Sequence, residues 1–164
     1  LDLSFAKTLE QLGIERVLTC MQCGTCTASC PSGRYAAYRT RLVLRKVLLG
    51  LREEILSDPD LWLCTTCYNC QERCPRKIDV VDLIIVLRNM AFAAGHARER
   101  HVQISKFFIE TGHLVPINEE NMKKRRELGL SEKPPTTHSF PKALEEVKAL
   151  ASYFGFDKIV LGER

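Results

Sequence analysis

All eight cysteines of this sequence fall into two motifs that share one spacing, C-x2-C-x2-C-x3-C-P. The first motif extends from Cys20 to Pro31 and the second from Cys64 to Pro75, so corresponding cysteines lie 44 residues apart. Thiolates at this spacing bind iron–sulfur clusters, and a [4Fe–4S] cubane takes four of them. The sequence therefore predicts two [4Fe–4S] clusters.

The fourth cysteine of each motif, which precedes a proline, indicates how the ligands divide. In two-cluster ferredoxins with this run, the fourth cysteine binds the cluster of the other motif. We therefore expect each set of metal ligands to draw on both motifs: Cys20, Cys23, Cys26 and Cys74 for the first cluster, and Cys64, Cys67, Cys70 and Cys30 for the second. Each cluster then ties the motifs together, so that metal binding and folding are coupled.

The cysteine count also bears on the kind of chemistry. Eight thiols fill the eight iron positions and leave no position open for a substrate, as a catalytic metal site requires. We therefore predict clusters that carry electrons, and no catalytic residue in this chain. A structural zinc module is the non-redox alternative. It normally shows paired C-x2-C knuckles and has no use for a third cysteine at the same short interval.

Helices are expected to position the second motif. Residues 39–56, between the motifs, carry leucine, valine and isoleucine at helical spacings of three and four. Asp58 followed by Pro59 is a typical helix start, which predicts a short helix leading into Cys64.

The chain after the second motif is also predicted to be helical. Asp79 is placed to cap a helix over residues 80–94, which Gly95 ends. Further helices are expected over 97–111 and 142–156, and no segment alternates convincingly as a strand does. The sequence thus predicts an all-α fold.

Composition changes near residue 114, where the chain becomes charged and polar. We therefore expect an α-helical cluster-binding domain over residues 1–113 and a helical C-terminal extension over 114–164. Because two clusters do not need this extension, it is interpreted as a surface for docking a partner.

Charge and hydropathy argue against a nucleic-acid partner and against a membrane span. The formal charge of +4 counts every cysteine as a neutral thiol, and eight thiolates with two cluster cores bring it close to zero, so nucleic acid is not an expected partner. The start of the chain has no signal-peptide pattern. The longest apolar run, 80–95, contains Asp82 and Arg88 and is shorter than the roughly 20 residues of a membrane span. We expect a cytoplasmic protein, where regular cysteine spacing indicates metal binding.

Three segments of the sequence resemble one known family: CMQCGTCTASCPSGR, RLVLRKVLLGL and LWLCTTCYNCQERCPRKIDVVDLI. They resemble the C subunit of the soluble heterodisulfide reductases of methanogenic archaea, within the α-helical ferredoxin group. The resemblance covers residues 16–115. It implies an α-helical ferredoxin fold in which the eight cysteines bind two [4Fe–4S] clusters.

The resemblance also implies partners. In that family, the C subunit relays single electrons from a flavin-containing A subunit to a catalytic B subunit, which reduces the heterodisulfide of coenzyme M and coenzyme B in methanogenesis. Hydrogenase or formate dehydrogenase supplies the electrons to the flavin-containing subunit. The expected function is therefore that of a non-catalytic electron-transfer subunit of an oxidoreductase.

Other functions are compatible with the two motifs alone. One is a free-standing dicluster ferredoxin, although such carriers are typically shorter and strongly acidic. Another is the equivalent relay subunit of a different oxidoreductase, in sulfur metabolism or of the succinate, glycolate or lactate type. A redox sensor is a further alternative, and no nucleic-acid-binding motif supports it.

Overall fold

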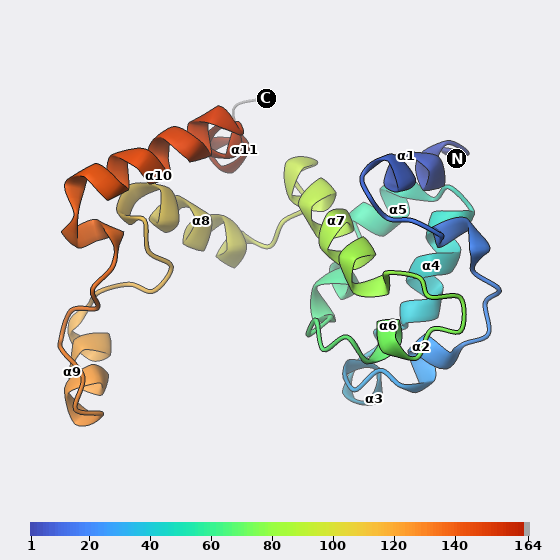
Figure 1. Ribbon diagram of the computed structural model, residues 1–164, viewed down its shortest axis with the longest axis horizontal. Helices are drawn as coiled ribbons and strands as arrows, with labels where there is room; N and C mark the ends of the chain where they lie inside the picture. The colour runs from blue at the N-terminus through green and yellow to red at the C-terminus, as the bar shows by residue number, and fades with distance from the viewer. Residues whose placement is uncertain (163–164) are drawn as a thin grey trace. The chain divides into compact units, whose positions relative to one another are not determined.

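The protein is described by a computed structural model that covers residues 1–162 and divides into two compact units (Figure 1). The first unit is Leu1–His96, and the second begins at Ala97. Every secondary-structure element within residues 1–162 is a helix, which confirms the predicted all-α class. No helix in this range is long and apolar enough to cross a membrane.

The first unit holds both cysteine motifs. Its elements are α1 (Phe5–Gln11), η1 (Val17–Thr19), α2 (Thr25–Ala28), α3 (Ser32–Tyr35), α4 (Thr40–Leu48), α5 (Arg52–Leu56), η2 (Pro59–Leu63), α6 (Asn69–Glu72) and α7 (Val80–Ala93). The short helices α2 and α6 lie inside the first and second motif, and they pack against each other. Helix α2 also contacts α4, and α6 contacts α7. The two halves of the unit therefore repeat one arrangement.

The longer helices supply the apolar core around the motifs. Helix α7 buries Val81, Leu83, Ile84 and Leu87 completely, as expected for a core helix. Residues from α1, α4, α5 and η2 meet it in one cluster that includes Phe5, Leu9, Val47, Ile55 and Leu61. Burial of each large aliphatic side chain stabilises the fold by about 1.5–3 kcal/mol. The unit thus has an apolar core that also takes in three of the cysteines, Cys26, Cys30 and Cys70.

The helix expected over residues 39–56 is divided in the structure. Helix α4 ends at Leu48 and α5 begins at Arg52. Between them, Gly50 has a left-handed backbone with φ 66°. The N–H of Leu51 donates to the Lys46 carbonyl (3.0 Å) and that of Gly50 to the Val47 carbonyl (3.0 Å), which is the hydrogen-bond pattern of a Schellman C-cap.

The break at Gly50 also receives the N-terminus. The N–H of Asp2 donates to the Gly50 carbonyl at 2.7 Å. A glycine is needed because a Cβ at this position clashes with the Asp2 carbonyl. The turn between α4 and α5 therefore anchors the start of the chain.

The start of η2 and the end of α7 confirm two predicted boundaries. The Asp58 carboxylate accepts the N–H of Asp60 at 2.9 Å, with Pro59 as the first residue of η2. Lys46 holds the other Asp58 oxygen at 2.9 Å and also pairs with Glu54 at 3.1 Å. Gly95, left-handed with φ 87°, follows the last turn of α7.

The second unit consists of α8 (Glu99–Thr111), α9 (Glu119–Glu127), η3 (Thr137–Ser139), α10 (Pro141–Tyr153) and α11 (Phe156–Leu161). Helix α8 packs against α10 and α11 and so belongs to this unit. The domain boundary predicted from composition lies later, at 113/114. The composition changes there, but the packing of α8 sets the division of the structure at 96/97.

The Gly50 contact leads to a first prediction. Gly50→Ala is expected to lower the midpoint of thermal unfolding, measured by circular dichroism without oxygen, more than the control Gly13→Ala. Both glycines have left-handed φ angles, 66° and 90°, so alanine costs about 1–3 kcal/mol of strain at either one. Only at Gly50 does the added Cβ meet backbone atoms, because nothing lies within 4 Å at Gly13. Equal losses would show that the Asp2 contact adds nothing.

Candidate cluster-binding site

The two cysteine motifs share one backbone conformation. Gln22 and Gly24 have left-handed φ angles of 57° and 86°, and so do Thr66 (51°) and Tyr68 (62°) at the corresponding positions of the second motif. Left-handed backbone is uncommon for residues other than glycine and costs about 1–3 kcal/mol where it occurs. Its repetition in both motifs indicates that the cysteine spacing, rather than local preference, sets the loop shape.

The four cysteines of the predicted first ligand set surround one pocket. Cys20, Cys23 and Cys26 of the first motif line it together with Cys74, the last cysteine of the second motif. Apolar side chains of Leu44, Ile78 and Val80 complete the wall. The fold thus brings the fourth cysteine of one motif to the first three of the other.

Members of the second predicted set also influence one another or share a neighbour. Cys64 and Cys67 both act electrostatically on the thiol of Cys70. Cys30, from the first motif, lies with Cys64 near the hydroxyl of Tyr38, since both act on that group. Cys30 and Cys64 thus share one neighbour, Tyr38.

The spacing of these thiols differs from that of a single-ion site. Within residues 1–162, no three His, Cys, Asp or Glu side chains converge as ligands of one metal ion do. In a cubane the four thiolates bind four different irons, so they stand further apart than the ligands of one zinc ion. Four cysteines around one pocket match the ligand number of a [4Fe–4S] cluster, which would supply one-electron redox chemistry when bound.

Burial separates the cysteines into inner and outer groups. Cys26, Cys30 and Cys70 are buried, whereas Cys23 and Cys67 are exposed. Burial raises the pKa of the Cys26 thiol, and burial with the charge of Cys64 raises that of Cys70 to about 12. Bound iron would lower these thiol pKa values again, because a coordinating thiol is held as the thiolate.

Three of the less buried cysteine sulfurs, those of Cys20, Cys23 and Cys64, make hydrogen bonds. Gln22 Nε2 donates to Cys20 Sγ at 3.3 Å, and the N–H of Thr66 donates to Cys64 Sγ at 3.4 Å. Thr25 Oγ1 lies 3.4 Å from Cys23 Sγ, and this hydrogen bond lowers the pKa of the Cys23 thiol. Such contacts stabilise the negative charge of a thiolate-bound cluster and tune its reduction potential.

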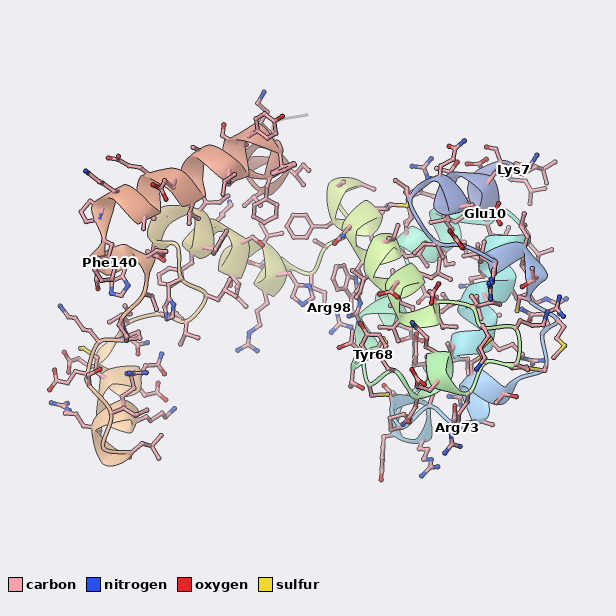
Figure 2. All side chains as sticks on the ribbon, in the orientation of Figure 1. Lys7, Glu10, Tyr68, Arg73, Arg98 and Phe140 are labelled. Atoms are coloured by element: carbon pink, nitrogen blue, oxygen red, sulfur yellow. The ribbon has the colours of Figure 1, made fainter. Side chains whose placement is uncertain are left out.

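Two arginines anchor the chain where it enters each motif. Arg76 Nε donates to the Thr19 carbonyl at 3.2 Å, directly before Cys20. Arg88 of α7 donates through Nη2 to the Cys64 carbonyl at 2.7 Å and lies over the Trp62 ring, 5.6 Å from its centroid. The other cations flanking the motifs, Arg34, Arg73 and Lys77, are exposed (Arg73 and the exposed Tyr68 are labelled in Figure 2).

The residue after the third cysteine of each motif caps a long helix. Thr27 Oγ1 accepts the N–H of Arg41, the second residue of α4, at 2.8 Å. Gln71 Oε1 accepts the N–H of Val81, the second residue of α7, at 3.0 Å. Each motif is thereby fixed to the helix that follows it.

Gln71 also explains why the predicted Asp79 cap is wrong. Asp79 precedes α7, but its side chain makes no cap hydrogen bond. Its carboxylate instead accepts a hydrogen bond from Gln71 Nε2 at 3.2 Å, as Asp82 does at 3.3 Å. The side-chain oxygen of Gln71 therefore accepts the hydrogen bond from the N–H of Val81 in place of Asp79.

Comparison with known proteins is consistent with this geometry. Residues 16–78 match the family model described as a 4Fe-4S dicluster domain. The chain is 50% identical over 160 residues to the C subunit of the H(2):CoB-CoM heterodisulfide,ferredoxin reductase of Methanothermobacter marburgensis, covering 98% of this chain and 86% of the relative. It is 49% identical over 151 residues to the iron-sulfur C subunit of the CoB–CoM heterodisulfide reductase of Methanopyrus kandleri, covering 92% and 79%. It is 49% identical over 153 residues to the C subunit of the ferredoxin:CoB-CoM heterodisulfide reductase of Methanosarcina mazei, covering 93% and 94%.

Three residues at the site were missed by the sequence analysis. Gln71 was identifiable, because both motifs carry a hydrogen-bonding side chain after the third cysteine. Arg88 was visible as a charge inside an apolar helix, but its carbonyl partners were not. Tyr38 lies outside both motifs, and nothing in its local sequence relates it to a cysteine.

Gln71→Ala is expected to lower the free energy of unfolding by about 1–3 kcal/mol, because it leaves the buried start of α7 without its acceptor. Gln103→Ala is the matched control, since Gln103 makes one exposed hydrogen bond, to Glu99. Denaturant unfolding of the iron-loaded protein without oxygen measures both. Similar losses for the two variants would contradict the role assigned to Gln71.

Proposed function

The chain belongs to the C-subunit family of CoB–CoM heterodisulfide reductases, and from that premise we propose how it carries electrons. The resemblance recognised in the sequence is confirmed. The protein is an iron–sulfur, electron-transfer subunit of an oxidoreductase complex. The proposal concerns its clusters, their ligands and its partners.

The proposed cofactors are two [4Fe–4S] clusters with crossed ligation. Cys20, Cys23, Cys26 and Cys74 hold the first, and Cys64, Cys67, Cys70 and Cys30 hold the second. The observation that carries this assignment is the pocket lined by Cys74 with the three first-motif cysteines. The position of Cys30 and Cys64 beside Tyr38 supports the second set.

The burial pattern supports a path for electrons through the protein. Cys26 and Cys70 are buried on the adjacent helices α2 and α6, and the charge of one acts on the other. Electron transfer weakens steeply with distance, so this pair is the proposed passage between the clusters. Cys23 and Cys67 are exposed, and each offers its cluster a short route to a partner at the surface.

The proposed partners are the flavin-containing subunit, which donates electrons, and the catalytic heterodisulfide reductase subunit, which accepts them. Hydrogenase or formate dehydrogenase is the indirect source of electrons. The names of the relatives support this, since they combine H2 or ferredoxin with the CoB–CoM heterodisulfide. Cysteines arranged as metal ligands rather than disulfides support a cytoplasmic location.

The C-terminal extension, residues 114–164, is proposed to dock a partner subunit. Its helix α10 and the turn after it expose large apolar side chains: Leu150 at 59%, Tyr153 at 83% and Phe154 at 74%. Only Ala151 and Val160 of the described residues beyond 96 are buried apolar side chains. Apolar surface of this kind is typical of a protein interface.

Crossed ligation predicts which cluster each fourth cysteine supports. Cys30→Ser is expected to remove or alter the cluster of the second motif, and Cys74→Ser that of the first. Each variant should retain about half of the wild-type iron and sulfide, because eight thiols supply two cubanes. Electron paramagnetic resonance of the reduced proteins measures which signal is lost. If Cys30→Ser and Cys74→Ser lost the signal of their own motif, uncrossed ligation would replace the proposal.

Native mass spectrometry of the protein purified without oxygen from its own cells tests the relay function. We expect a large assembly in which this chain carries eight irons and eight sulfides, with masses that identify the flavin-containing and catalytic subunits. A lone chain with two clusters would instead indicate a free-standing ferredoxin. A metal content of zinc without sulfide would contradict both functions.

A further inference from the structure

One buried polar side chain near the second ligand set is not explained by the fold. Tyr38 lies between α3 and α4 and is only 1% exposed. Its hydroxyl makes no hydrogen bond of normal geometry with any atom among the described residues. A buried hydroxyl without a partner is costly, and folded proteins rarely keep one.

The groups that act on the Tyr38 hydroxyl include sulfur acceptors. They are the hydroxyl of Thr40, which is also buried and without a partner, and the thiols of Cys64 and Cys30. Thr40 can donate its proton to the Tyr38 oxygen, which leaves the tyrosine proton for another acceptor. Among these groups, the sulfurs of the second ligand set are the acceptors that remain.

The corresponding residue of the other half is apolar. Tyr38 stands two residues before Thr40, the first residue of α4, and Ile78 stands two residues before Val80, the first residue of α7. Both side chains are 1% exposed. Ile78 lines the pocket of the first ligand set, and it offers that set no hydrogen bond.

We propose that Tyr38 donates a hydrogen bond to a sulfur of the cluster held by Cys64, Cys67, Cys70 and Cys30, and thereby raises the reduction potential of that cluster alone. This inference rests on the crossed ligation proposed above. A donor at sulfur stabilises the additional negative charge of the reduced cluster, so the reduced form is favoured. Because Ile78 takes the equivalent place, the first cluster lacks this contribution.

The protonation state of Tyr38 agrees with a donor role. Burial, and next the negative charge of Cys64, raise the pKa of Tyr38 well above its ordinary value.

Tyr38→Phe tests the proposal in the purified, iron-loaded assembly, since phenylalanine keeps the buried ring and removes only the hydroxyl. Redox titration followed by electron paramagnetic resonance is expected to show a more negative midpoint for the second cluster and an unchanged midpoint for the first. Tyr35→Phe is the control, because Tyr35 is 93% exposed on the adjacent helix α3. It should move neither midpoint.

A spectroscopic measurement separates a hydrogen bond from a packing effect. After exchange into D2O, electron–nuclear double resonance of the reduced wild-type protein should show an exchangeable proton coupled to the second cluster. Tyr38→Phe should lose that coupling, whereas Tyr35→Phe should keep it. An unchanged midpoint, a shift of the first cluster instead, or a retained coupling would overturn the proposal.

Different results would contradict the crossed ligation and the role of Tyr38. In a Cys74→Ser background only the second cluster is expected to remain, and Tyr38→Phe should still shift it. If Cys74→Ser removed the second cluster instead, the crossed ligation would be wrong whatever Tyr38 does. If the ligation held and the remaining cluster did not shift, the role of Tyr38 alone would be wrong.

Discussion

The position of Cys74 beside the three cysteines of the other motif is the constraint on which the first unit depends. To place it there, the chain leaves the first motif, turns at Gly50 between α4 and α5, and returns through η2. Most of the buried apolar side chains come from these connecting helices and from α7. In the proposed ligation, cluster binding stabilises the same fold. Its free energy is gained only when Cys74 lies beside the first three cysteines.

The helices next to the motifs favour cluster binding by their electrostatics as well as by their packing. Helices α4 and α7 begin directly against the motif helices, where Thr27 and Gln71 accept their N–H groups. The N-terminal end of a helix carries a partial positive charge that favours nearby negative charge. Clusters bound by four thiolates are negative, so the same contacts that fix the motifs also favour the cofactor.

The sequence predicts the parts of this fold that depend on spacing and periodicity. The approach of Cys74 to the first three cysteines is expected from the cysteine spacing, and the helix over 80–94 from its apolar run and Gly95. The sequence does not show which of two side chains accepts a given backbone N–H. Asp79 is a good cap by type, but Gln71 accepts the N–H of Val81 in its place. The contact of Gly50 with the N-terminus is hidden in the same way, because Gly50 and Asp2 are far apart in the chain.

The interleaved order of the cysteines has a consequence for biosynthesis. A nascent chain that has emerged only as far as Leu63 contains four thiols, Cys20 to Cys30, but in the proposed ligation they belong to different sets, three to one and one to the other. The set containing Cys30 becomes complete at Cys70, and the set containing Cys20 only at Cys74. With this ligation, cofactor assembly on the ribosome cannot proceed one motif at a time, and the early thiols must stay reduced until the second motif has been translated.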